Sequence, residues 1–442
     1  MTGASTLENM SPEILKVAER AKREPDAKFH SLAHLIDEAA LKRAYDRIRK
    51  DAATGVDGTT KDDYGQDLDE KLRDLHERLK TLRYRHQPIR RVHIPKDGGR
   101  TRPIGVSTIE DKIVQDALRE VLEAVYEQDF FDCSYGFRRG RRAHDALKVL
   151  DRAAHRGEAN WIIEADIVSF FDSIDREQLR EMIKRRVPDG SVHRLVGKCL
   201  NVGVLDGDLF ETPSEGTTQG SVLSPLLGNI YLHYALDEWF EREVRPRLRG
   251  RAILVRYADD FVIGFEHKDD AERVWQVLPK RMQRHNLQLH PNKTRLFDFR
   301  RPSRNQTGGK GPATFDFLGF TVMWKRGRAG GWGFTLNTRR ARLSRAILAA
   351  AEWCRGHRHL PLDAQHVALK RRLQGHINYF GVPGNLRTID RMLFVVRRNW
   401  FKWLRRRSNH SRLNWERFRE ILQRYPLPLA RVAVPMWASR ET

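Results

Sequence analysis

Residues 253–265 read ILVRYADDFVIGF, an apolar and largely β-branched run that is interrupted at its middle by two adjacent carboxylates. The apolar residues on either side predict two short buried strands, and Ala-Asp-Asp predicts the tight turn that joins them. Two carboxylates at the tip of a buried hairpin repel each other and lose hydration, so a divalent cation between them would offset both costs. Oxygen-rich sites of this kind suit magnesium.

A second stretch supplies a third carboxylate. Adjacent Asp residues are often only a solvated turn, so a metal site at Asp259 and Asp260 needs a further ligand. Residues 161–174, WIIEADIVSFFDSI, carry Asp166 at the end of an apolar run, which predicts a strand that presents one acid. Two-metal phosphoryl transfer requires carboxylates that converge from different segments of the chain. Asp166, Asp259 and Asp260 would meet that requirement.

The order of these motifs resembles the palm of a reverse transcriptase. Tyr-Ala-Asp-Asp lies downstream of Asp166-x-x-x-x-Phe171 and of Gln219-Gly220, which precedes a predicted helix. Among reverse transcriptases, the sequence is most similar to the bacterial group II intron proteins, or maturases, from about Gly55 to Arg407. The resemblance implies a right-hand polymerase, with α/β fingers and palm built on antiparallel sheet and followed by an α-helical thumb.

The same resemblance implies an RNA-directed DNA polymerase that uses two Mg²⁺ ions and deoxynucleoside triphosphates. The implied metal ligands are Asp166, Ile167, Asp259 and Asp260. Lys293, in a segment that would lie near the pyrophosphate leaving group, would be a general acid. Taken alone, Lys293 could equally be an ordinary surface lysine.

Several residues would bind substrate if the resemblance holds. Residues 88–106 predict a β-hairpin whose turn is flanked by Lys96 and Arg102, and both would contact the triphosphate, although an exposed basic hairpin is also ordinary. Phe171 would be the steric gate that excludes a 2′-hydroxyl, with Phe170 pointing the other way on an extended segment.

The segment of residues 216–220 would border the nascent base pair through Gln219 and Gly220, and Tyr257 would also lie at the substrate. Thr218 stands where the family usually has Pro. We therefore expect the positioning of the templating base to differ in detail.

Basic segments predict nucleic-acid contacts. Residues 134–142, SYGFRRGRR, place four arginines beside two aromatic residues, and this composition suits phosphates and base faces, although a solvated basic loop is the alternative. Helical periodicity over residues 339–355, 364–380 and 386–407 predicts the thumb, with one face packed and the other following phosphates. The predicted contacts are Arg138, Arg139, Arg141, Arg142, Arg339, Arg340, Arg342, Arg345, Arg397, Arg398 and Lys402.

Composition supports a polyanionic partner. The chain of 442 residues has 81 Lys and Arg against 58 Asp and Glu, a formal charge of +23, so we expect an RNA template and a DNA or RNA primer. No apolar run approaches the roughly 20 residues of a spanning helix, and the first residues lack a signal-peptide pattern. The sequence predicts a bacterial cytoplasmic protein that nucleic acid draws to the nucleoid, with no membrane partner. It does not indicate an oligomeric state.

The three cysteines, Cys133, Cys199 and Cys354, form no Cys-x-x-Cys pair, which argues against a disulfide framework or a zinc site. Because no His/Cys cluster follows the predicted thumb either, the chain resembles the endonuclease-lacking members of the family. We therefore expect the protein alone not to nick double-stranded DNA.

The predicted domains are an N-terminal helical extension (1–54), fingers and palm (55–325), the thumb or maturase domain X (326–407) and a C-terminal tail (408–442). A second role would be maturase action, in which the protein binds a group II intron RNA and supports its splicing and retromobility. Two alternatives remain open: a free-standing reverse transcriptase of host defence or DNA repair, and a non-enzymatic RNA-binding splicing factor. The three acids argue against the second alternative.

Overall fold

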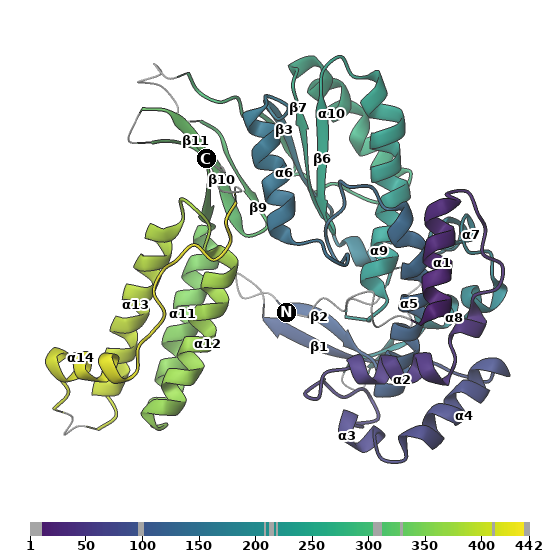
Figure 1. Cartoon of the computed structure of the whole chain (residues 1–442), viewed down its shortest axis with the longest axis horizontal. Coiled ribbons are helices and arrows are strands. Elements are labelled where there is room, and N and C mark those ends of the chain that lie inside the picture. Colours follow the sequence, from purple (N-terminus) through teal and green to yellow (C-terminus); the bar gives the residue numbers. More distant parts are fainter. Residues whose placement is uncertain are drawn as a thin grey trace. The chain divides into compact units, whose positions relative to one another are not determined.

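The computed structural model describes residues 11–95, 101–206, 209–211, 216–217, 220–303, 312–327, 330–408 and 412–436. These residues form two compact units that interleave along the sequence (Figure 1). Unit 1 comprises Met1–Arg142, Ile163–Ile263 and Asp269–Leu296, and unit 2 comprises Ala143–Ile162, Gly264–Lys268 and Phe297–Thr442. The predicted class, α/β followed by a helical segment, is confirmed. The four consecutive domains predicted above remain a prediction.

Most helices belong to unit 1. They are α1 (Pro12–Arg23), η2 (Ala33–Leu35), α2 (Glu38–Arg47), α3 (Lys61–Tyr64), α4 (Leu68–Lys80), α5 (Ile109–Asp129), η4 (Phe170–Asp172), α7 (Arg176–Lys184), α8 (Gly190–Leu200), α9 (Ser224–Leu232), the π-helical η5 (His233–Asp237) and η6 (Trp239–Val244), η7 (Arg245–Arg247) and α10 (Lys268–Gln283).

Helix α5 is buried on nearly all sides, although it carries several acids. Arginines from other segments neutralise these acids. Arg47 of α2 donates to Asp116 at 2.6 Å and to Glu120 at 3.0 Å. Because a buried carboxylate without a partner is costly, these ion pairs allow a charged helix to serve as part of the core.

The predicted hairpin of residues 88–106 is confirmed as β1 (Ile89–Pro95) and β2 (Thr101–Val106), which pair antiparallel with Ile94 opposite Arg102. With β4 (Val204–Asp206) and β5 (Leu209–Glu211) they form a sheet in the order β2-β1-β4-β5. The turn between β1 and β2, including Lys96, lies outside the described residues.

A second sheet has the order β6-β7-β3-β8. Its strands are β3 (Trp161–Asp166), β6 (Ala252–Tyr257), β7 (Asp260–Phe265) and β8 (Arg295–Asp298). The hairpin and the acid-bearing strand predicted from residues 253–265 and 161–174 are therefore confirmed. Side chains of β6 and β7 such as Val255 and Phe261 are fully buried, so the hairpin is fixed in the core.

Arg256, one residue before the Tyr-Ala-Asp-Asp motif, is the centre of a buried polar network. Its guanidinium donates to both carboxylate oxygens of Asp237, at 2.7 and 2.5 Å, and both side chains are fully buried. It also donates to Asn229 Oδ1 at 3.0 Å, to Ser134 Oγ at 2.7 Å and to the carbonyl of Ala258 at 3.0 Å. One side chain thus joins the hairpin to η5, α9 and the segment around residue 134.

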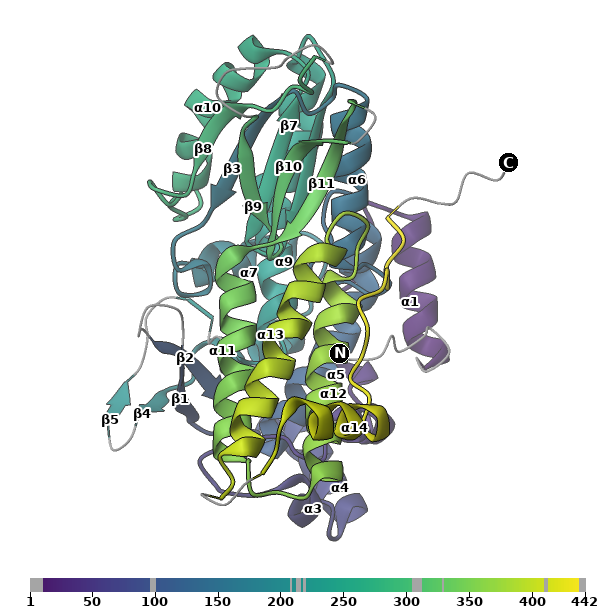
Figure 2. The ribbon, with the colours of Figure 1, turned by 90° about the vertical axis from the view of Figure 1, so that its left-hand side faces the viewer.

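Unit 2 holds a third sheet and the C-terminal helices. The sheet order is β11-β10-β9, from β9 (Thr314–Phe317), β10 (Phe320–Arg326) and β11 (Trp332–Thr338), and α6 (Ala143–His155) belongs to the same unit. The helices α11 (Arg340–Gly356), α12 (Leu362–Phe380) and α13 (Leu386–Arg405) lie side by side in Figures 1 and 2. They confirm the three helical segments predicted for the thumb.

The segment after α13, predicted above as a C-terminal tail, forms a helix and packs into a buried cluster. It forms α14 (Trp415–Arg424), and Phe418 and Leu427 join the buried cluster around Trp400. Trp400 donates its indole N–H to Gln365 of α12 at 2.9 Å. Within the described residues, no helix is both long enough and apolar enough to span a membrane.

We predict that Arg256→Gln destabilises the fold by about 3–5 kcal/mol, because it leaves the buried carboxylate of Asp237 without its cation. Urea unfolding measures the free energy. The control is Arg249→Gln, since Arg249 and Asp269 form an exposed ion pair at 3.4 Å that contributes at most about 1 kcal/mol. Equal losses in the two variants would contradict the central role of Arg256.

Candidate active site

The tip of the β6–β7 hairpin is held in an unusual backbone conformation. Ala258 has a φ of 57°, in the left-handed region that L-residues with a side chain rarely adopt. Its backbone lies directly against Gly136, where an added Cβ would come within 2.4 Å of the Ala258 nitrogen. The contacts with Gly136 on one side and Arg256 on the other therefore fix the turn that carries Asp259 and Asp260.

The structure brings Asp166 and Asp259 together from two strands. Strands β3 and β7 are neighbours, with Asp166 ending β3 and Asp259 preceding β7. Burial raises the pKa of Asp259, and the negative charge of Asp166 raises it further, whereas Arg102 and Arg256 act in the opposite direction. The two carboxylates are thus close enough to repel each other, and Arg102 of β2 lies within range of the same charge.

Lys293 forms an ion pair with Asp166 through its ammonium group. The lysine side chain is 60% exposed and that of Asp166 29% exposed, so the pair is accessible to solvent. The sequence placed Lys293 near the reaction but did not predict this contact. The Lys293 ammonium thus compensates the negative charge of Asp166.

The backbone around Asp166 orients the carbonyl of Ile167. The Asp166 carbonyl accepts from His290 N at 2.8 Å, and Val168 N donates to the Gln288 carbonyl at 2.9 Å. This pattern forms a bridge in which Ile167 is opposite Leu289, and the polar backbone groups of Ile167 point to the other side of the strand. The Ile167 carbonyl is therefore not used by this bridge.

Across the described ranges, no group of three or more His, Cys, Asp and Glu side chains is arranged to hold a metal ion. The chemistry of the acids nevertheless fits a hard cation. Asp166 and Asp259 are oxygen donors that repel each other, and Asp259 is half-buried, with its pKa raised by partial burial. A cation would favour the ionised form of Asp259.

The two phenylalanines after β3 lie on the 3₁₀ helix η4, so the predicted extended segment is wrong. Phe170 is buried, whereas Phe171 is half-buried, and their ring centroids are 5.1 Å apart. Both rings lie near Gly228 of α9, where an added Cβ would be 3.0 Å from Phe170 and 3.3 Å from Phe171. The tight turn, in which Asp172 N donates to the Ser169 carbonyl at 2.8 Å, replaces the alternation of a strand, and Thr217 N from another segment donates to the Phe171 carbonyl at 2.7 Å.

Gly220 lies against the β1–β2 hairpin. Its φ is 113°, and an added Cβ would be 2.4 Å from the carbonyl oxygen of Gly105 in β2. Tyr257, half-buried at the end of β6, has its pKa raised by burial. Thr218 and Gln219 lie outside the described residues.

The arginines of residues 138–142 do not all face outward. Arg138 is buried and donates to Glu127 of α5 at 2.8 Å, and Arg139 donates to Glu123 at 2.8 Å. Arg141 pairs with Asp132 at 2.6 Å, and Arg142 is exposed. Phe137 is the more accessible aromatic group of this segment, with 60% of it exposed and a φ of 59°.

In unit 2, the predicted arginines at the start of α11 are exposed, and Arg339 pairs with Asp316 at 2.9 Å. On α13, Arg398 and Lys402 are exposed while Arg397 is half-buried. Arg398 lies over the ring of Phe394, itself 57% exposed, at 5.8 Å. Helix α13 therefore has a basic outer face that carries an aromatic ring.

Residues 94–322, just over half of the chain, match the family model described as reverse transcriptase (RNA-dependent DNA polymerase). The chain is 32% identical over 379 residues to protein YkfC of Escherichia coli strain K12. This match covers 76% of this chain and 95% of YkfC.

Two shorter matches are to intron proteins. The chain is 34% identical over 213 residues to the group II intron-encoded protein LtrA of Lactococcus lactis subsp. cremoris, covering 46% of this chain and 35% of LtrA. It is 30% identical over 140 residues to nuclear intron maturase 4, mitochondrial, of Arabidopsis thaliana. This match covers 31% of this chain and 17% of that protein. The resemblance found in the motifs is thus confirmed, and this chain belongs to the reverse transcriptase family, the RNA-directed DNA polymerases.

Proposed function

We propose that this chain extends a DNA or RNA primer on an RNA template with two Mg²⁺ ions, and that Asp166, Asp259, Asp260 and the carbonyl of Ile167 hold them. The observation that carries the proposal is the approach of Asp166 and Asp259 from separate strands, close enough for the charge of one to raise the pKa of the other. When bound, the ions would activate the primer hydroxyl and stabilise charge on the transferred phosphate and the leaving pyrophosphate.

Lys293 would act at two stages. Its ion pair with Asp166 neutralises this acid in the absence of a cation. Once released from Asp166, the ammonium lies beside the acid and can donate a proton to the leaving pyrophosphate. Its exposure allows this movement, because neither partner is locked in the core.

Arg102 and Phe171 would select and orient the incoming nucleotide. Arg102 is exposed on β2 and acts electrostatically on Asp259, so a triphosphate bound by its guanidinium would lie beside the acids. Phe171, half-buried against α9, would present its ring to the sugar and exclude a 2′-hydroxyl. Lys96 and Gln219 complete the proposed substrate contacts.

We further propose a maturase role, because two of the relatives are named as intron proteins. The RNA would be a group II intron, bound in part by the basic outer face of α13 and the exposed arginines of α11. Arg138 and Arg139 would not contact the RNA directly, since both are hydrogen-bonded to acids of α5. Arg141, Arg142 and Phe137 would be the contacts from that segment.

We predict that Asp259→Asn or Asp166→Asn reduces primer extension to background and leaves RNA affinity nearly unchanged, because the acids serve the chemistry and the basic surfaces serve binding. The measurements are extension of a DNA primer on an RNA template and equilibrium RNA binding. Extension at a near wild-type rate by either variant would refute the site.

We predict that Phe171→Ala admits ribonucleotides, because it opens space beside the sugar. The matched control is Phe170→Ala, which removes a buried ring and should cost about 3–5 kcal/mol of stability without changing sugar selection. Competition between ribonucleotides and deoxynucleotides during extension measures the selection. Unchanged rejection of ribonucleotides by the Phe171 variant would mean that another group is the gate.

We predict that Gly136→Ala slows extension about 100-fold, because the added methyl group must displace the turn that carries Asp259. The control is Gly356→Ala at the end of α11, where a Cβ meets no atom within 4 Å. Extension rates are compared at matched folded protein, as judged by thermal unfolding. If the two variants extend equally well, the contact with Gly136 does not set the geometry of the acids.

A further inference from the structure

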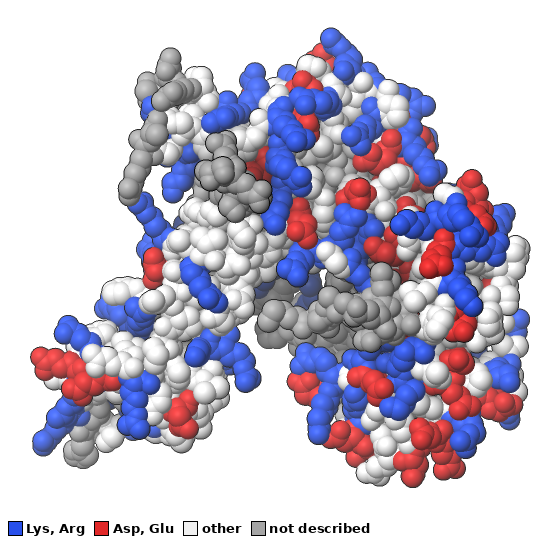
Figure 3. Space-filling view, viewed as in Figure 1, with Lys and Arg blue, Asp and Glu red and all other residues white. Residues whose placement is uncertain are grey.

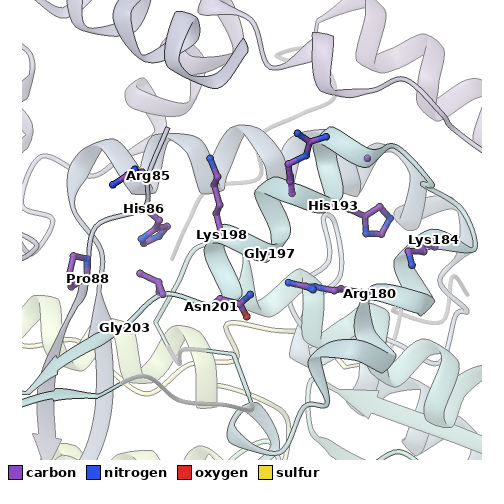
Figure 4. A pocket seen from close by; sticks show the side chains of 13 residues that line it. Arg85, His86, Pro88, Arg180, Lys184, His193, Gly197, Lys198, Asn201 and Gly203 are labelled. Atoms are coloured by element: carbon purple, nitrogen blue, oxygen red, sulfur yellow. The ribbon is translucent and has the colours of Figure 1, made fainter. Parts of the chain in front are cut away.

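A basic cavity of about 730 Å³ lies in unit 1, among α7, α8 and the segment before β1. Figure 4 shows Arg85 and His86 at one end and His193 and Lys184 at the other, with Lys198, Asn201 and Arg180 between them. No Asp or Glu is among the described residues that line it. Its five cationic side chains, which define what we name the α7–α8 basic pocket, are Arg85, Arg180, Lys184, Arg194 and Lys198.

Three of these cations have no partner in the part of the chain that the structure describes. Arg85, Arg180 and Arg194 form no hydrogen bond or ion pair there, and the Nε of Arg180 is buried without an acceptor. Gly197 of α8 makes room for Arg180, since an added Cβ would be 2.7 Å from its Nη2. A guanidinium held in this way without an acceptor is costly unless a ligand supplies one.

The two remaining cations differ: Lys184 forms an ion pair with Glu181 of α7, whereas Lys198 is bonded to backbone carbonyls and lies in an uncompensated positive field. Lys198 donates to the carbonyl of Leu82 at 3.1 Å and to that of Tyr84. Burial lowers its pKa, and the neighbouring charges of Arg194 and Arg85 lower it further. An anion in the pocket would relieve this repulsion.

The surrounding surface differs from the pocket. Over α2, α3 and α4, Figure 3 shows Lys and Arg side by side with Asp and Glu. The start of α8 is not the source of the field either, because its N–H groups at Ser191 and Val192 are bonded to Asp189 at 2.8 and 3.2 Å. The positive charge of the pocket therefore comes from its side chains.

The lining favours a phosphate backbone over a nucleotide. No Phe, Tyr or Trp is among the described lining residues, and Pro88 and Val202 are its larger apolar groups, so it offers no platform for a stacked base. Several cations spread over such a volume match consecutive phosphates better than a single small anion. The pocket shares no residue with the acids of the proposed active site.

We propose that the α7–α8 basic pocket binds phosphodiester groups of a folded RNA that the protein holds in addition to its primer and template. This assignment rests on the proposed function, which supplies the structured RNA. Exposed Arg85 and Arg194 would receive the backbone, and Arg180 would anchor one phosphate deeper in the pocket.

The test compares two double variants that remove the same charge. Arg85→Gln with Arg194→Gln empties the rim of the pocket, and Lys280→Gln with Arg284→Gln removes exposed cations at the end of α10 and just beyond it. The probe is a stem-loop RNA without primer, and its affinity is measured over a range of KCl concentrations. The pocket variant should lower the slope of log affinity against log salt by about 1 to 2, and the control variant by much less.

Primer extension on a short primer–template separates this proposal from the proposed function. The pocket variant should extend at the wild-type rate, and absence of extension by the wild-type protein would contradict the polymerase site and not the pocket. An equal change of slope in the two variants would overturn the pocket assignment, because it would indicate a general effect of charge. The same loss with a DNA hairpin of matching sequence would overturn the assignment to RNA.

Discussion

The buried ion pair between Arg256 and Asp237 is the constraint on which the active-site geometry depends. Arg256 is adjacent to the motif that carries the acids, and its five hydrogen bonds reach η5, α9, the segment around Ser134 and the turn itself. Asn229 extends the network, since it donates to the carbonyl of Gly136 at 2.7 Å. Because every partner is buried, a displacement of the turn would leave a charged group unsatisfied. The acids are therefore positioned from the interior of unit 1.

The sequence predicted the elements that depend on local periodicity. The alternating and apolar runs around Asp166 and Asp259 predicted β3, β6 and β7, and the helical period predicted α11 to α13. It did not predict Arg256 as a core residue, because its partner Asp237 lies in a π-helical turn 19 positions earlier and Ser134 is 122 positions away. A pairing of this kind exists only in the folded chain, and the sequence around Arg256 indicated a buried strand without showing which acid would neutralise the guanidinium.

The arginine-rich segment of residues 134–142 also forms contacts that the sequence did not predict. Four arginines in nine residues predicted a surface for nucleic acid, yet Arg138 and Arg139 bond with Glu127 and Glu123. The signal that could have indicated this is the number of acids on α5, a helix that is buried on nearly all sides. Acids on a buried helix require cations from elsewhere, and the nearest dense source is this segment.

A net charge of +23 therefore does not describe the binding surface by itself. Arginines such as Arg47, Arg138 and Arg256 form ion pairs within the fold. Removing one of them would leave an acid without its partner and destabilise the protein. Arg398 and Lys402 of α13 and Arg85 and Arg194 of the α7–α8 basic pocket have no acid partner among the described residues, and a bound polyanion would compensate their charge. The partners of each cation thus separate residues that build the fold from residues that are available to a polyanion, a distinction that composition alone does not make.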